Sequence, residues 1–182
     1  MNRYKSWILP RRTFCRVVQS KHPGKPLPDV LECLYDGNPE SGEMTIMPSI
    51  FTRIIHKELP ARFVWEDEQC VAFLSANPLR PGHTLVVPRQ EVDYWIDLEP
   101  KLADHLFKTA QLLARALQHG FKPVKVGLMI AGLEVRHVHI HLVPISTLTD
   151  LNFEKQDRNP NPVDMDGAAE RIRSSIQAMQ QP

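Results

Sequence analysis

The segment Arg136–Pro144, with the sequence Arg-His-Val-His-Ile-His-Leu-Val-Pro, constrains the fold of this chain more than any other feature. Side chains along a β-strand point alternately to opposite faces. A strand that Pro144 ends therefore places His137, His139 and His141 on one face. The other face carries Val138, Ile140 and Leu142. We expect a strand that packs on a core through its aliphatic face and presents three imidazoles in a row on the opposite face.

The remaining pattern predicts an α+β domain. Ser49 can cap a helix that Pro60 closes, and Asp97 can cap a long helix over residues 98–119. A last helix is expected over residues 164–179. The predicted strands are 63–65, 71–74, 83–87, 125–130 and 136–143. Short strands in close succession favour an antiparallel sheet of about five strands, with one long helix across it and a C-terminal helix.

A row of three histidines suits two kinds of chemistry. In a metal site, the outer two imidazoles would be ~13 Å apart along the strand. That is too far for both to bind one zinc ion with Zn–N bonds of ~2.0–2.1 Å, so a further ligand is needed, for which His83 and Glu134 are candidates. In phosphoryl or nucleotidyl transfer, a neutral imidazole attacks phosphorus and its neighbours donate hydrogen bonds to the phosphoryl oxygens. The second chemistry uses all three histidines, and we favour it.

The histidine strand and several segments before it resemble the histidine-triad (HIT) family of nucleotide hydrolases and transferases. The strand has the pattern His-φ-His-φ-His-φ-φ, where φ is an apolar residue. The resemblance spans about residues 47–146 and is strongest to the phosphoramidase-type branch. Its other segments are Ser49–Ile55, Glu58–Ala61, Glu66–Glu68, Ala72–Phe73, Pro78 and Pro81–Pro88.

This resemblance implies a fold of the HIT type and a hydrolase mechanism. It assigns His139 as the nucleophile, places His141 and His83 against the phosphate oxygens, and gives His137 an orienting role. The implied reaction cleaves a phosphoramidate or phosphoanhydride bond at the α-phosphate of a purine nucleotide conjugate. It proceeds through a nucleotidyl-histidine (phosphohistidine) intermediate and releases the nucleoside monophosphate. No metal or cofactor is implied, and a homodimer is expected.

The resemblance also implies a nucleotide-binding pocket with two departures from the family pattern. Ser75 stands where relatives have the acid that binds ribose, and Ser75 and Asn77 are expected to hydrogen-bond a hydroxyl. Leu133 and Glu134 replace a polar pair before the triad, and Glu134 brings a negative charge to an anionic substrate. The base is expected to contact Ile50, Phe51, Ile54, Phe73 and Leu74.

Two alternative functions stay open. One is a low-turnover module that binds a nucleotide or a protein partner, which the residues at Ser75 and Glu134 suggest. The other is a metal-dependent hydrolase built on one His-x-His pair. Structural zinc, which some relatives bind through C-x-x-C in the opening helix, is not expected, because Ser49 and Thr52 stand there.

Composition bears on partners and compartment. The 182 residues carry a net charge of +1, which argues against a binder of polymeric nucleic acid. No apolar run approaches the ~18 residues of a membrane span, so no membrane partner is expected. Three cysteines without C-x-x-C spacing fit a reducing compartment, and we expect a cytoplasmic protein.

The N-terminal segment differs from the rest of the chain. Seven basic residues and no acidic ones occur in residues 1–28, and prolines and glycines interrupt residues 1–46. We expect residues 1–46 to be a disordered extension, 47–146 to be the HIT domain, and 147–182 to be a C-terminal tail and helix. The alternative for residues 1–28 is an organelle-targeting peptide.

Overall fold

The computed structural model describes residues 48–181, so the extension predicted for residues 1–46 lies outside the described residues. The helices are α1 (Ile50–Ile55), α2 (Pro100–Phe121) and α3 (Pro162–Gln180). The strands are β1 (Phe63–Glu66), β2 (Cys70–Leu74), β3 (Thr84–Pro88), β4 (Lys125–Met129) and β5 (Ile140–Ile145). Short 3-10 helices form at Trp95–Asp97, Leu148–Leu151 and Phe153–Lys155.

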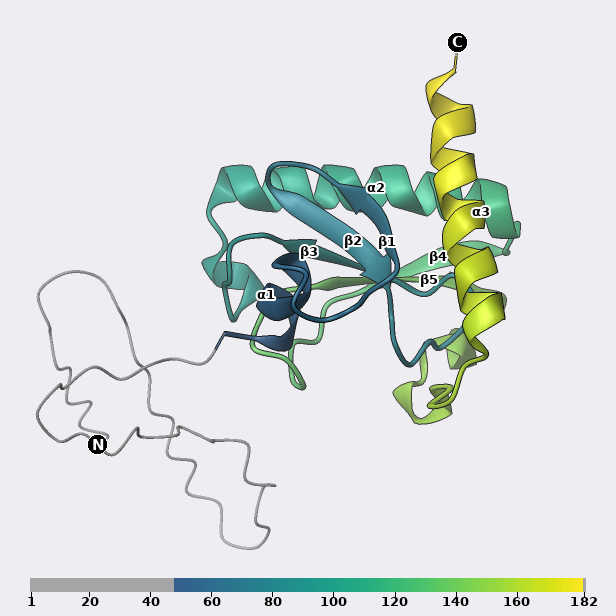
Figure 1. Cartoon of the computed structure of the whole chain (residues 1–182), viewed down its shortest axis with the longest axis horizontal. Coiled ribbons are helices and arrows are strands. Elements are labelled where there is room, and N and C mark those ends of the chain that lie inside the picture. Colours follow the sequence, from purple (N-terminus) through teal and green to yellow (C-terminus); the bar gives the residue numbers. More distant parts are fainter. Residues whose placement is uncertain (1–47, 182) are drawn as a thin grey trace, which may run out of the picture. The chain divides into compact units, whose positions relative to one another are not determined.

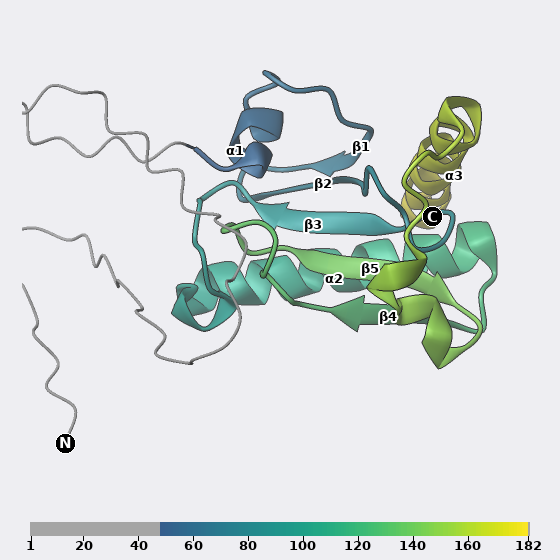
Figure 2. The same ribbon diagram turned by 90° about the horizontal axis from the view of Figure 1, so that it is seen from below.

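The five strands form one antiparallel sheet in the order β1-β2-β3-β5-β4. The long helix α2 crosses one face of this sheet, α1 lies on the opposite face, and α3 stands at one end (Figures 1 and 2). The predicted α+β architecture, with five strands, a long helix and a C-terminal helix, is confirmed.

Two hydrophobic cores hold these layers together, one on each face of the sheet. Residues two apart in β2 share a face: Ala72 and Leu74 belong to the core under α2, whereas Val71 and Phe73 belong to the core under α1. Both β2 and β3 are buried along their whole length. The α1 core therefore fixes a short helix of six residues against the middle of the sheet.

The two long helices differ from the predictions at their ends. Asp97 closes a 3-10 helix, and α2 begins at Pro100 with Glu99 at the N-cap, so Asp97 is not its cap. Helix α2 continues through Gly120 and ends where Lys122 adopts a left-handed conformation, with φ of 49°. Helix α3 packs on the core of its own chain through residues such as Ile172, whereas Met179 near its C-terminal end is 40% exposed.

The histidine strand is shorter at its start than predicted. Strand β5 begins only at Ile140, because the backbone N–H of Val138 donates to the carbonyl of Val92 (2.7 Å) instead of to a neighbouring strand. At its other end, the strand continues through Pro144. The alternation of faces is nevertheless kept. Val138, Ile140 and Leu142 lie in the core under α2.

Over residues 48–181, the structure contains no helix with the length and apolar character that crossing a membrane requires.

Candidate functional site

Four histidines gather on the face of the sheet that α1 covers. His83, His137, His139 and His141 are all buried, with exposed fractions between 0% and 7%. The ring centroids of His139 and His141 are 4.7 Å apart, and those of His83 and His141 are 5.2 Å apart. The structure therefore brings together the three predicted triad residues and the distant His83. Phe51 of α1 lies against the row, 4.9 Å from the His139 ring.

A chain of hydrogen bonds fixes the orientation of His83 and His141. The backbone N–H of Leu79 donates to His83 Nδ1 (3.1 Å), so a neutral His83 carries its proton on Nε2. His83 Nε2 lies 3.0 Å from His141 Nδ1 and donates to it. His141 therefore carries its own proton on Nε2. Both ring nitrogens of His83 therefore have hydrogen-bond partners within the protein.

His137 and His139 are held in the same way. His137 Nε2 donates to the carbonyl of Pro88 (2.8 Å), so its Nδ1 accepts from the hydroxyl of Ser49 (2.8 Å). His139 Nδ1 donates to the backbone carbonyl of His137 (2.7 Å). The proton of a neutral His139 is therefore on Nδ1, and its Nε2 is an acceptor.

Two ring nitrogens of this cluster have no hydrogen-bond partner among residues 48–181. They are Nε2 of His139, an acceptor, and Nε2 of His141, a donor. No buried side-chain nitrogen or oxygen among the described residues lacks a partner, so both atoms reach solvent. The site therefore presents one lone pair and one N–H side by side on adjacent rings.

Burial keeps the imidazoles neutral. Burial, aided by the neighbouring His139, lowers the pKa of His83 to about 4. Burial and the rings of His139 and His83 lower the pKa of His141 to about 3. The pKa values of His137 and His139 are also lowered, chiefly by burial. At neutral pH, His139 Nε2 therefore carries a free lone pair.

The predicted base-contacting residues separate into three groups. Phe51, Ile54 and Phe73 are buried together in the core under α1, where the rings of Phe51 and Phe73 are 5.6 Å apart. Ile50 lies on the same helix and is 49% exposed. Leu74 belongs to the core under α2 on the opposite face of the sheet. The prediction that Leu74 lines the same pocket as Phe73 does not fit the structure.

The polar candidates lie at the ends of the strands. Ser75 is 9% exposed, and its hydroxyl donates to the carbonyl of Asn77 (3.2 Å), whereas the Asn77 residue itself is exposed. Glu134 is exposed, and its charge favours the protonated form of His139 and so raises the pKa of that ring against the effect of burial. Of these three candidates, only Glu134 therefore has an electrostatic effect on the His139 ring.

Two residues near the histidines were not predicted from the sequence. Phe153, in the 3-10 helix after β5, lies 5.2 Å from the His141 ring at an angle of 83°. Glu91, in the loop after β3, accepts hydrogen bonds from the Ser49 backbone N–H (3.1 Å) and the Thr52 hydroxyl. Neither lies in a periodic segment, so the sequence carries no signal for these contacts.

The contacts of Glu91 also help to decide whether this part of the protein can bind a structural zinc ion. Ser49 and Thr52 stand where some relatives are expected to have zinc-binding cysteines, and here they form a hydrogen-bonded network with Glu91 and His137. Structural zinc sites use thiolate and imidazole ligands, whereas these two side chains are neutral hydroxyls with partners of their own. The residues do not fit a structural zinc ion.

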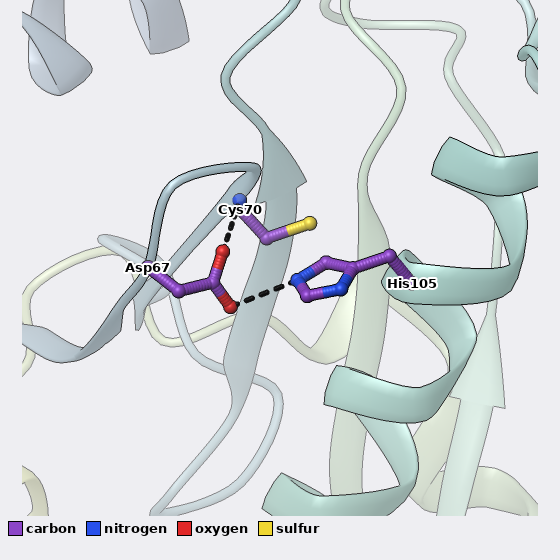
Figure 3. A group of neighbouring side chains, drawn as sticks. All are labelled: Asp67, Cys70 and His105. Carbon is purple, nitrogen blue, oxygen red and sulfur yellow. Dashed lines mark hydrogen bonds and ion pairs between the residues drawn. The ribbon is translucent and has the colours of Figure 1, made fainter.

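A second group of metal-ligating side chains lies at the β1–β2 turn (Figure 3). Asp67, Cys70 and His105 each place a ligand atom within 4.8 Å of the others. Burial opposes ionisation of Asp67, but hydrogen bonds from Trp65, Cys70 and Gln69 outweigh it and lower the pKa of Asp67 to about 2. Burial, followed by the charge of Asp67, raises the pKa of Cys70 to about 12. This group is explained by hydrogen bonds that tie the turn to α2, and we assign no metal to it.

The comparisons with known proteins agree with this geometry. The family model that matches is the HIT domain, over residues 56–148. An uncharacterized HIT-like protein of Methanocaldococcus jannaschii is 38% identical over 99 residues, which are 52% of this chain and 77% of that protein. An uncharacterized HIT-like protein of Borreliella burgdorferi is 36% identical over 102 residues, which are 52% of this chain and 73% of that protein.

Solved structures share the fold. A hypothetical histidine triad nucleotide-binding protein from Sulfolobus tokodaii matches with a TM-score of 0.64 and 26% identity, over 71% of this chain and 93% of that one. A zinc-bound histidine triad family protein from Mycobacterium smegmatis matches with a TM-score of 0.62 and 26% identity, over 71% and 94% of the two chains.

The lowered pKa values predict that the fold loses stability in mild acid. An unfolded histidine takes up a proton below its ordinary pKa of about 6.5, whereas folded His83 does so only near 4. Stability is therefore complete above pH 6.5 and falls as the pH drops toward 4. Between pH 7.5 and 5, His83 alone contributes up to about 2 kcal/mol to this loss. Urea unfolding at the two pH values measures it, and H83Q should flatten the dependence. A free energy of unfolding equal at both pH values would contradict the neutral assignment.

Proposed function

We propose, because the chain belongs to the histidine-triad (HIT) family, that it is a nucleotide-binding hydrolase whose nucleophile is His139. One observation carries the proposal: the only open acceptor of the histidine cluster among residues 48–181 is His139 Nε2, and an open N–H donor lies on the adjacent His141 ring. A lone pair beside a donor is the arrangement that attack on a phosphoryl group requires.

The first chemical step follows from these atoms. The lone pair of His139 Nε2 attacks the α-phosphorus and forms a P–N bond. The bond from phosphorus to the leaving nitrogen or oxygen breaks, its electron pair goes to the leaving atom, and that atom takes a proton from water. The His139 ring, now bonded to phosphorus, becomes cationic, and the carbonyl of His137, which accepts from His139 Nδ1, offsets this charge. The oxygen of a water molecule then attacks phosphorus, the P–Nε2 bond breaks, and its electron pair returns to His139. The proton that this water loses neutralises the hydroxide left by the first step, and the nucleoside monophosphate is released.

His141 stabilises charge and does not supply the proton. Its pKa is about 3, so the ring is neutral at pH 7, and a neutral imidazole is a poor acid. Its Nε2–H donates a hydrogen bond to the phosphoryl oxygen as negative charge grows there. His83 is a positioning residue, since it holds His141 in the tautomer that leaves this donor free. His137 positions α1 and His139 through its bonds to Ser49 and its own carbonyl.

The proposed substrate is a purine nucleotide conjugate, linked through a phosphoramidate or phosphoanhydride bond. The nucleoside half would lie at the Phe51 end of the row, where Ile50, Ile54 and Phe73 are neighbours and Leu74 is not. Ser75 and Asn77 at the end of β2 would contact the sugar. The exposed carboxylate of Glu134 would lie near the cationic nucleotidyl-histidine, whose charge it favours.

The direct test is turnover of an adenosine phosphoramidate. H139A removes the nucleophile, and we expect kcat/KM to fall by about a thousandfold or more. The matched control is H56A, since His56 lies in the same half of the protein with its side chain 62% exposed. Both variants are checked for an unchanged melting temperature. Undiminished turnover by H139A would contradict the proposal. Stabilisation of the wild type by AMP without turnover of any conjugate would favour a low-turnover binding module.

We also propose that the protein forms a homodimer through α2 and the edge strand β4. A groove of about 490 Å³ runs between these elements. Phe107 and Leu128 line it and are 40% and 46% exposed, which is unusual for large apolar side chains beside an open sheet edge. Light scattering should find a dimer that F107D dissociates, while V163D on exposed α3 surface leaves it intact. A monomeric wild type would contradict this arrangement.

A further inference from the structure

The segment that follows β5 returns to the histidine site. The HIT domain model matches as far as residue 148, so the two 3-10 helices of this segment, Leu148–Leu151 and Phe153–Lys155, lie beyond the match except for Leu148. Phe153 places its ring against His141, with 5.2 Å between the centroids and 83° between the planes. The ring is only partly buried, so part of its surface stays open.

Hydrogen bonds hold this segment in place at both ends. At its start, the Asp150 carboxylate accepts from the backbone N–H groups of Ser146 and Thr147 (2.8 and 2.9 Å). At its end, the backbone N–H of Asp157 donates to the carbonyl of Pro78 (3.0 Å). Pro78 directly precedes Leu79, whose N–H orients His83. The segment therefore joins the strand that carries His141 to the turn that orients His83, with Phe153 between these two ties.

A phenylalanine ring lies at each end of the pair formed by His139 and His141. Phe51 lies 4.9 Å from the His139 ring, His139 lies 4.7 Å from His141, and His141 lies 5.2 Å from Phe153. The two phenylalanines contact different histidines. If the nucleoside lies at the Phe51 end, the group on the other side of the phosphorus extends toward Phe153.

Charge at the Phe153 end does not suit an anionic leaving group. The segment from Ser146 to Arg158 contains three acidic residues (Asp150, Glu154 and Asp157) and two basic ones (Lys155 and Arg158). Arg80, on the neighbouring turn, is 3.8 Å from the Asp150 carboxylate. With Arg80 counted, the acidic and basic groups at this end balance, so a polyphosphate would meet no excess of positive charge, whereas an apolar or aromatic group would gain contact with the Phe153 ring.

We propose that Phe153 is a specificity-determining residue, whose ring contacts the leaving group and favours conjugates with an apolar or aromatic amine over those with a polyphosphate. This inference rests on the proposed function. Phe153 contributes no proton and no charge. It acts by packing against the leaving group and by excluding water beside the His141 donor.

The test compares two substrates that share the adenylyl half. One is the phenethylamide of AMP, and the other is the unsubstituted amide, which releases ammonia. In F153A, we expect kcat/KM for the phenethylamide to fall about tenfold, which is the loss of about 1.4 kcal/mol of contact. The unsubstituted amide should change by less than about threefold, because its leaving group does not reach the ring. F153L should fall between the wild type and F153A.

The matched control is L148A. Leu148 lies in the same segment and is 84% exposed, so kcat/KM for both substrates should stay at the wild-type level. The decisive quantity is the ratio of the kcat/KM values for the two substrates, because damage to His141 or to the fold lowers both values together.

Three results would overturn the inference. The first is a kcat/KM in F153A that equals the wild-type value for both substrates, and the second is a kcat/KM that falls by the same factor for both. The third is a wild-type preference for diadenosine tetraphosphate over the phenethylamide. Each of these leaves the proposed hydrolase intact. Failure of the wild type to cleave any of the three substrates would instead overturn the proposed function, and this inference with it.

Discussion

A neutral imidazole has one N–H donor and one acceptor nitrogen, and when the ring is buried each of them needs a hydrogen-bond partner. This requirement determines how the four histidines of the site are oriented. Leu79 and His83 fix the tautomer of His141, and the His137 carbonyl fixes that of His139. Once these bonds are made, the position of every proton is determined. The cluster then leaves one lone pair and one N–H open among the described residues, so the hydrogen bonds that stabilise the buried rings also decide which ring offers an acceptor and which offers a donor.

The two hydrophobic cores, one on each face of the sheet, hold the histidines in this arrangement. The core under α2 holds Val138, Ile140 and Leu142, which turns the histidines to the other face. The core under α1 brings Ser49 and Phe51 onto that face, where Ser49 completes the bonds of His137. The low pKa values follow from the same packing, since burial that excludes water also disfavours the charged imidazole.

Much of this could be predicted from the sequence, because strict alternation decides which side chains are buried. The faces of residues 137–142 were predicted correctly even though β5 begins only at Ile140, since the aliphatic residues are buried with or without ladder bonds. The same rule, applied to β2, separates Leu74 from Phe73, which the family resemblance had grouped together. The position of His83 behind His141, and the approach of Phe153, depend on turns and 3-10 helices that have no period. Such contacts are set by the three-dimensional path of the chain.

The central claim is that a histidine, and not water, attacks the α-phosphorus. The stereochemical course of hydrolysis tests it most directly, with a nucleotide conjugate that is chiral at the α-phosphorus through sulfur and an oxygen isotope. Each in-line displacement inverts the configuration at phosphorus. Attack by His139 followed by attack of water gives two inversions, so we expect overall retention of configuration in the released monophosphate. Overall inversion would show a single direct attack by water and would rule out His139 as the nucleophile.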